Sequence, residues 1–266
     1  MSQDKPQDKP AAIVTGSSSG MGAATAVKLA ALGWNVVVNA ATSAKDAEAV
    51  ARQCEKAGGK AVVAMGDVSS DADCKRIAAQ CVKSFGRIDA LVNNAGTTKS
   101  VPAANMDGLD AADFARIFAV NVAGPFLMIR ACLPSLRAAR GSVVNVSSNA
   151  GLSGQGSSVA YSASKGALNT MTLSLARALA PEIRVNAVLP GFTETPWHEK
   201  FSGAAAAKHV ADHFRATSTL RRNTSPEDIA DAVVWFVTGA KSSTGQLFVV
   251  DAGLHLHVNA PPPRKS

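Results

Sequence analysis

Aromatic residues are scarce in this sequence of 266 residues, at 5%, and only one residue of the chain is a tyrosine. Basic residues outnumber acidic ones by 27 to 20, but they are scattered along the chain instead of forming a stripe. Nucleic-acid binding needs a basic face and aromatic side chains that stack on bases, so it is not expected here. The small positive excess suits an anionic cofactor or substrate.

Cysteine is also rare, and its spacing argues against two classes of site. The four cysteines include no C-x-x-C pair; they are Cys54, Cys74, Cys81 and Cys132. We therefore expect reduced, buried thiols rather than disulfides or a cysteine metal site. His209 and His213 stand one helical turn apart, a spacing that a metal could use, but no third ligand lies at a motif distance, so no metal is expected.

Long apolar runs and a leader pattern are missing as well. No apolar run approaches the length of about 18 residues that a membrane span needs, and the N-terminus lacks the basic and then apolar order of a secretory signal. We expect a cytoplasmic protein without a membrane partner. A hydrophobic share of 47% predicts one globular domain over residues 11–258. Residues 1–10, with a doubled Gln-Asp-Lys-Pro, and 259–266, with three successive prolines, are expected to be disordered tails.

Strand and helix patterns alternate along the domain without a linker. Short runs rich in β-branched residues predict strands at 11–15, 36–39, 61–65, 90–93, 142–147, 183–189 and 247–250. Patterns rich in Ala, Leu, Arg and Lys predict helices at 22–32, 46–57, 70–84, 110–131, 159–180 and 226–238. This alternation indicates an α/β fold: a Rossmann-type doubly wound parallel sheet of about seven strands, with helices on both faces in three layers. Ligands of such sheets bind at the carboxyl ends of the strands.

The first predicted strand runs directly into the glycine-rich segment Thr15-Gly16-Ser17-Ser18-Ser19-Gly20-Met21-Gly22, which opens a helix. Glycines let the backbone turn tightly and let phosphate oxygens approach the N–H groups at the positive end of a helix. This placement favours a dinucleotide-binding loop over a flexible Ser/Gly linker. The segment also satisfies Gly-x-Ser-x-Gly around Ser18. A hydrolase elbow, however, needs strands and an oxyanion loop before it, and only fifteen residues precede Gly16.

The single tyrosine, Tyr161, precedes Lys165 by four positions, so the two share one face of the predicted helix. A phenol is a poor acid or base at neutral pH, and a nearby ammonium group favours the phenolate and lowers the phenol pKa. The pair therefore predicts acid/base chemistry. If it stood alone, a half-buried tyrosine beside a solvated lysine would be the ordinary interpretation.

Six motifs follow one another along the chain: the glycine-rich segment, Asn93-Asn94-Ala95-Gly96, Asn121, Ser147-Ser148, the Tyr161/Lys165 pair and Pro190-Gly191. In this order and spacing they resemble the short-chain dehydrogenase/reductase family, over about residues 11–256. The three-residue gap between Gly16 and Gly20 is similar to that of the compact members, among them the 3-oxoacyl carrier-protein reductases.

The resemblance implies a catalytic set of Asn121, Ser148, Tyr161 and Lys165. Tyr161 would protonate the carbonyl oxygen during reduction, or act as the base in reverse, while Lys165 would lower the Tyr161 pKa and hold the cofactor ribose. The family serine lies thirteen positions before the tyrosine, which selects Ser148 over Ser147; its hydroxyl would bond the substrate oxygen. Asn121 would help to order a water that relays protons.

The resemblance also implies a nicotinamide cofactor, and the end of the second predicted strand bears on which one. An Asp or Glu there usually holds the 2′-hydroxyl of NAD, but residues 39–43 contain no acid. NADP(H) is therefore favoured over NAD(H), although Ser19 stands where many NADP-binding members carry Arg or Lys, and only Lys45 lies nearby. The residues expected to bind the cofactor, besides Tyr161 and Lys165, are Gly16, Ser18, Ser19, Gly20, Met21, Gly22, Ala41, Thr42, Ser43, Asp67, Val68, Asn93, Ala95, Gly96, Pro190, Gly191, Thr193 and Thr195.

The substrate side is less clear from the sequence. Residues 194–222 form a long segment expected to cover the nicotinamide as a lid, opposite the Gly- and Ser-rich wall 151–158. We predict an NADP(H)-dependent oxidoreductase acting on a small carbonyl or secondary alcohol, in a homo-oligomer that the resemblance implies to be a tetramer. Two other interpretations are a nucleotide-sensing regulator without chemistry and, less favoured, a serine hydrolase using Ser18. Exposed arginines could attract an anionic carrier domain, so the substrate stays open; they are Arg137, Arg140 and Arg177.

Overall fold

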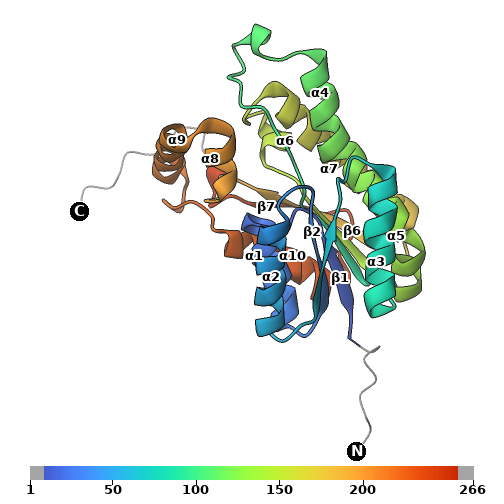
Figure 1. Cartoon of the computed structure of the whole chain (residues 1–266). Coiled ribbons are helices and arrows are strands. Elements are labelled where there is room, and N and C mark those ends of the chain that lie inside the picture. Colours follow the sequence, from blue (N-terminus) through green and yellow to red (C-terminus); the bar gives the residue numbers. More distant parts are fainter. Residues whose placement is uncertain (1–8, 257–266) are drawn as a thin grey trace, which may run out of the picture.

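The computed structural model describes residues 9–256 (Figure 1). Seven strands form one sheet in the order β3-β2-β1-β4-β5-β6-β7, and all of its pairings are parallel. The strands are β1 (Ala11–Val14), β2 (Asn35–Ala40), β3 (Ala61–Met65), β4 (Ala90–Asn93), β5 (Ser142–Val146), β6 (Arg184–Pro190) and β7 (Leu247–Val250). The predicted fold class is confirmed. The expected tails, apart from residues 9 and 10, lie outside the described residues, as do residues 257 and 258 of the predicted domain.

Helices cover both faces of the sheet. On one face, α1 (Gly20–Ala31), α2 (Ala44–Lys56) and α10 (Pro226–Thr238) enclose a core that contains Cys54. On the other, α3 (Asp71–Phe85), α5 (Gly124–Ala139) and α7 (Val159–Leu179) enclose a second core, with the other three cysteines. All four cysteines are free and buried, as expected. β1, β2, β4 and β5 are buried along their whole length because helices cover them from both sides, which explains their continuous apolar character.

The helix predicted at 110–131 differs from the observed one in length and in shape. It consists of α4 (Ala111–Phe118), a π-helical turn (Ala119–Ala123) and α5, which run without a break to Ala139. Over its 29 residues it contains a window of 18 residues with a mean hydropathy of 1.6, so by length and composition alone it could span a membrane, which the pattern of apolar runs did not indicate. Its apolar side chains instead pack in the second core, through Met128, Ile129, Cys132 and Leu136.

The segment expected to be a lid contains two helices, α8 (Pro196–Ser202) and α9 (Ala204–Thr217), which project beyond the carboxyl ends of the strands (Figure 1). The Glu194 carboxylate accepts hydrogen bonds from Arg215, at 2.7 Å, and from Asn223, at 2.9 Å. These bonds tie the beginning of the segment to its end. Smaller elements complete the described chain: the 3-10 turns at Met106–Gly108 and Leu254–Leu256, and α6 (Ala150–Ser153).

Candidate active site

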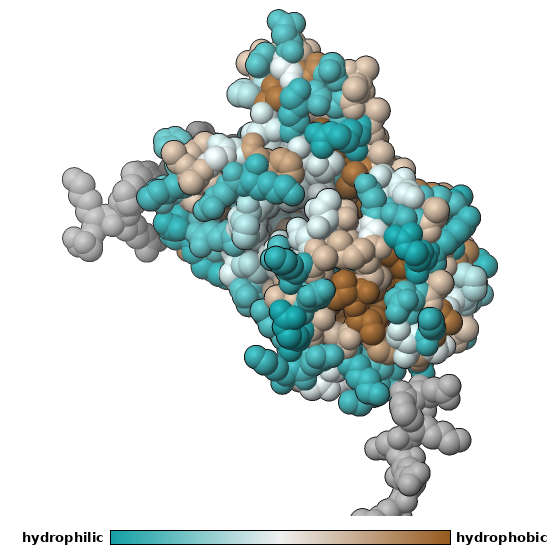
Figure 2. Space-filling view, in the orientation of Figure 1, coloured by the Kyte–Doolittle hydropathy of each residue, from teal (hydrophilic) through white to brown (hydrophobic). Residues whose placement is uncertain are grey.

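A cavity of about 800 Å³ opens at the carboxyl ends of the strands. Figure 2 shows it as a hollow between the lobe formed by α8 and α9 and the side of the molecule that carries α1 and α2. Its volume lies within the range of about 300 to 1,000 Å³ typical of small-molecule sites. It is lined at one end by the glycine-rich segment and the ends of β2 and β3, and at the other by Ser148, Tyr161 and Lys165.

The glycine-rich segment is shaped so that its backbone N–H groups stay available. Gly16 has φ +60, and a Cβ at that position would lie 2.8 Å from the Cα of Ala95, so only glycine fits. Within residues 9–256, the N–H groups from Ser18 to Gly22 have no hydrogen-bond acceptor, and Ser19, at the N-cap of α1, makes no side-chain cap. Ser18 to Met21 line the cavity, so their free N–H groups are available to an anion bound there, at the positive end of α1.

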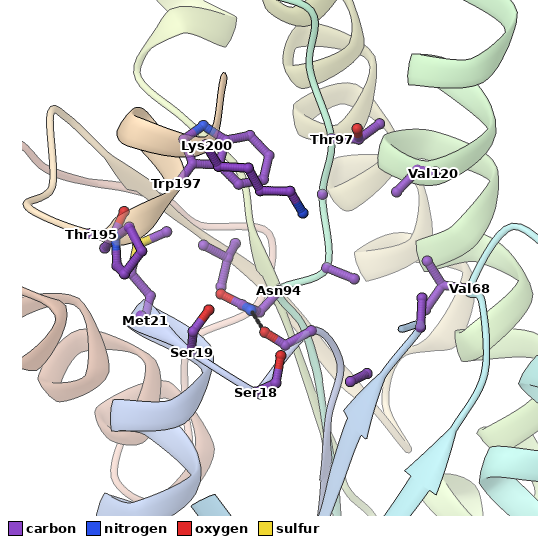
Figure 3. A pocket seen from close by; sticks show the side chains of 18 of the residues that line it. Ser18, Ser19, Met21, Val68, Asn94, Thr97, Val120, Thr195, Trp197 and Lys200 are labelled. Carbon is purple, nitrogen blue, oxygen red and sulfur yellow. Dashed lines mark hydrogen bonds between the residues drawn. The ribbon is translucent and has the colours of Figure 1, made fainter. Parts of the chain in front are cut away.

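Two asparagines that sequence reasoning did not assign to the site hold this segment in place. Asn94 donates from Nδ2 to the carbonyls of Thr15 and Gly16, at 3.0 Å each (Figure 3). Asn39 accepts from the Gly16 N–H and donates to the carbonyls of Ala64 and Gly66, so it joins the segment to the end of β3. A buried asparagine at a strand end was the available signal, since such a side chain needs partners for its donors and its acceptor.

At the inner end of the cavity, Tyr161 and Ser148 are hydrogen-bonded neighbours. Burial raises the pKa of Tyr161 to about 12, and the hydrogen bond with Ser148 offsets part of this rise. Burial also lowers the pKa of Lys165 to about 8. The Lys165 ammonium group donates to the carbonyl of Val146, at 3.0 Å, and lies 5.7 Å from the centroid of the Tyr161 ring. The expected lowering of the Tyr161 pKa by Lys165 is therefore not what governs the phenol here; burial is.

Ser147 and Ser148 point to different environments, as the alternation of a strand requires. The Ser147 hydroxyl donates to Asn169 Oδ1 at 2.6 Å, with the carbonyl of Lys165 as a second acceptor at 3.2 Å, and this docks α7 on β5. The Ser148 hydroxyl accepts from the N–H of Ala150 and reaches Tyr161.

Asn121 lies in the π-helical turn and is 1% exposed. Its side chain bonds both the N–H and the carbonyl of Thr97, at 2.8 and 3.0 Å, and donates to Ser164 Oγ at 3.0 Å. Ser164 Oγ in turn donates to the carbonyl of Tyr161. Asn121 therefore connects a wall of the cavity to the turn of α7 that carries the tyrosine.

Comparison with known proteins shows which family the chain resembles over its length. Residues 16–255 match the family described as Enoyl-(Acyl carrier protein) reductase. The chain is 43% identical to a protein named as a ketoacyl reductase of the granaticin polyketide synthase in Streptomyces violaceoruber, over 96% of this chain and 100% of that one. It is 33% identical to the 3-oxoacyl-[acyl-carrier-protein] reductase of Synechocystis sp., over 91% of this chain and 96% of that one. A crystal structure from Burkholderia xenovorans, described as a short-chain dehydrogenase/reductase, has a TM-score of 0.87 at 40% identity and covers 94% of this chain and 99% of its own.

The chain belongs to the short-chain dehydrogenase/reductase family. It is accordingly an oxidoreductase that acts on CH–OH groups, and the family implies a nicotinamide cofactor.

Most residues expected from the family motifs lie on the cavity wall, and three do not. Gly22 is beneath the glycine-rich segment, where a Cβ would lie 2.7 Å from the carbonyl oxygen of Gly16. Asn93 is 2% exposed and donates to Asn145 on the neighbouring strand, and Asn121 makes the contacts described above. The wall also includes residues that were not individually predicted for the site, namely Asn39, Ala40, Asp46, Gly66, Asn94, Thr97, Val120, Val146, Ser147, Pro196, Trp197, His198 and Lys200. The last four of these belong to the segment that was expected to be the lid.

The cavity can accommodate the dinucleotide that a short-chain dehydrogenase/reductase uses. It extends from Asp67 and Val68 at the end of β3, past the free N–H groups at the start of α1, to Tyr161 and Lys165. Near the end of β2 it is lined by Ala41, Thr42 and Ser43, and also by Asp46 in the first turn of α2, an acid that the strand-end analysis did not consider. Lys45 is exposed and is absent from the wall.

Proposed function

We propose that this chain is an NADP(H)-dependent reductase of ketones, or dehydrogenase of secondary alcohols, with Tyr161 as the group that gives or takes the proton. The observation that carries the proposal is the hydrogen-bonded Ser148 and Tyr161 pair at the inner end of a cavity whose outer end presents unpaired backbone N–H groups. The nicotinamide would supply or accept the hydride at this inner end.

The side chains have distinct roles in this proposal. With a pKa near 12, Tyr161 carries its proton at neutral pH and is ready to donate it to a carbonyl oxygen. Ser148 shares that oxygen and stabilises the charge that develops on it. Lys165 is the cation beside them on the wall, and its ammonium group is suited to bind the ribose hydroxyls of the cofactor. Asn121 connects the turn of α7 that carries Tyr161 to Thr97 by hydrogen bonds.

The preference for NADP(H) is supported by residues 39–43, which contain no carboxylate to repel a 2′-phosphate, and by the hydroxyl groups of Thr42 and Ser43 on the wall. Asp46 is the one nearby acid on that part of the wall. We expect the Kd of NADPH to be lower than that of NADH, and Asp46→Asn to tighten NADPH binding while leaving NADH unchanged. A lower Kd for NADH in the unmodified protein would reverse the assignment.

The proposed substrate class is supported by two relatives named as ketoacyl reductases and by one named as cis-4-hydroxycyclohexanecarboxylate dehydrogenase, 36% identical. We propose a small carbonyl or secondary alcohol, free or carried on a thioester, and a cytoplasmic homotetramer. Because the relatives are named as oxidoreductases, neither a regulator without chemistry nor a hydrolase that uses Ser18 has support.

Tyr161→Phe tests the proposal directly. The variant should lose turnover by several orders of magnitude across a panel of ketones, β-ketoacyl thioesters and alcohols, measured by cofactor absorbance, while its Kd for NADPH changes little. Undiminished turnover would overturn the assignment of Tyr161. Ser147→Ala is the matched control for Ser148→Ala, because both remove one hydroxyl from the same strand end and only Ser148 is bonded to Tyr161.

A further inference from the structure

Lys200 extends from the lid helix α8 into the cavity, above the turn that carries Asn94 (Figure 3). Its ammonium group lies 5.5 Å from the centroid of the Phe201 ring. Within residues 9–256, no carboxylate lies at ion-pair distance from it. Lys200 is therefore an exposed cation on the wall without a counter-ion.

The charges on the wall make Lys200 distinctive. Asp46 and Asp67 are the carboxylates, and Lys165 and Lys200 are the cations. The ammonium group of Lys165 is held at the inner end of the cavity by its hydrogen bond to the Val146 carbonyl. Burial lowers the pKa of His198, so its ring is neutral at pH 7.

The glycine-rich segment supplies no side-chain cation of its own. The side chains that it places on the wall are those of Ser18, Ser19 and Met21. A doubly charged diphosphate bound there would meet only backbone N–H groups and the positive end of α1. Its charge would be incompletely neutralised unless a cation came from elsewhere.

Contacts of the lid place the start of α8 beside this segment and beside the loop that follows β4. A Cβ on Gly20 would lie 3.3 Å from Thr195 Cγ2, and a Cβ on Gly96 would lie 3.7 Å from the tip of the Trp197 indole. Lys200 follows Trp197 by three positions on α8, and helical side chains lean toward the N-terminus of their helix. Its side chain accordingly extends back past Trp197 toward the cavity (Figure 3).

We propose that Lys200 supplies, from the lid, the counter-charge to the cofactor diphosphate that the glycine-rich segment lacks. This inference rests on the proposed function, since it presupposes a dinucleotide in the cavity. Binding of the diphosphate would then hold α8 down, so that cofactor affinity and lid closure depend on the same ion pair.

The test uses the full chain and compares Lys200→Gln with Lys200→Arg, and with Lys208→Gln as control. Lys208 lies on α9 of the same lid and pairs with Asp212, so its loss removes the same charge from a side chain outside this cavity. Isothermal titration calorimetry gives the Kd of NADPH, NADH, ADP-ribose and 2′-AMP at low and high salt. ADP-ribose retains the diphosphate without nicotinamide, and 2′-AMP lacks a diphosphate.

We expect Lys200→Gln to raise the Kd of NADPH, NADH and ADP-ribose by a similar factor, about tenfold at low salt and less at high salt, as for a lost charge-assisted hydrogen bond. The Kd of 2′-AMP should be unchanged, and Lys200→Arg and Lys208→Gln should bind like the unmodified protein. A loss confined to NADPH would assign Lys200 to the 2′-phosphate and overturn the proposal. So would unchanged cofactor binding, with or without a raised KM for an anionic ketone. If the unmodified protein binds no dinucleotide at all, the proposed function itself fails.

Discussion

Lys165 combines a central position in the site with surroundings that disfavour its charge. It is 4% exposed, and its ammonium group has the Val146 carbonyl as its hydrogen-bond acceptor. Burial lowers its pKa from 10.5 to about 8, so the folded protein holds this charge at neutral pH at an energetic cost. Such a desolvation cost, at a residue that we propose to be functional, is a common form of trade-off between stability and activity.

Lys165→Met should therefore stabilise the protein while it abolishes turnover. The shift corresponds to about 3 kcal/mol, of which about 1 is lost again because the Val146 carbonyl loses its donor. The net gain of about 2 kcal/mol should raise the Tm at pH 7 by about 4 to 8 °C in thermal denaturation.

The direction in which the stability gain of Lys165→Met changes with pH follows from the two pKa values of Lys165. The folded pKa lies below the unfolded one, so the unfolded chain binds more protons between pH 8 and 10.5, and the stability of the unmodified protein rises with pH in this window. The advantage of Lys165→Met should thus be largest below pH 8 and vanish toward pH 10.5. A lower Tm for the variant at pH 7 would contradict the assigned cost of the charge.

Tyr161 can be titrated without interference, because the chain has no other tyrosine. We expect the phenolate absorbance of the free protein to appear with a midpoint near pH 12, and Lys165→Met to leave this midpoint nearly unchanged, since burial governs the phenol. Oxidation of alcohols needs the phenolate and should accelerate with rising pH, while reduction needs the phenol. A midpoint below 9 in the free protein would show that the lysine charge dominates.

At the scale of elements, the strands were the most predictable part of the chain, because buried parallel strands are continuous β-branched runs, as in β2. The helices of the lid were not predicted, since residues 194–222 are polar and their ends are joined by contacts such as that of Glu194 with Arg215. The π-helical turn is also invisible in the pattern, because it depends on a partner distant in sequence, Thr97. The lid segment was expected to cover the cavity, but Trp197 and Lys200 could not be singled out as its contribution to the wall, because their placement depends on contacts with distant residues.

Asn121 connects the π-helical turn to the wall of the cavity, and its substitution tests what the turn does. Asn121→Ala leaves the Thr97 N–H and carbonyl without partners, at a cost of about 2 to 4 kcal/mol, and frees the Tyr161 turn of α7. Urea denaturation should show this loss, and kcat should fall more than the Kd of NADPH rises. Asn121→Asp keeps an acceptor for the Thr97 N–H and should recover part of the stability. Equal changes in kcat and cofactor Kd would place Asn121 in cofactor binding instead.

At the scale of the whole molecule, large apolar side chains are exposed on several elements of the described chain, among them α5 and β7. Phe126 of α5 is 44% exposed, and Phe248 of β7 is 45% exposed beside Trp235. A tetramer with dihedral symmetry needs two self-complementary faces of this kind, and aromatic side chains are typical of the centres of such faces.

Charge placed on either face should therefore remove one interface and leave the other. Phe126→Glu and Phe248→Glu should each give a dimer by light scattering, and the double variant a monomer, because a buried unpaired carboxylate is costly at an interface core. Leu32→Glu, at an exposed position after α1, is the control and should remain a tetramer. If light scattering shows that the unmodified protein is a monomer, the predicted tetramer is wrong. If the unmodified protein is a dimer and only one of the two substitutions makes it a monomer, the assembly has that one interface alone.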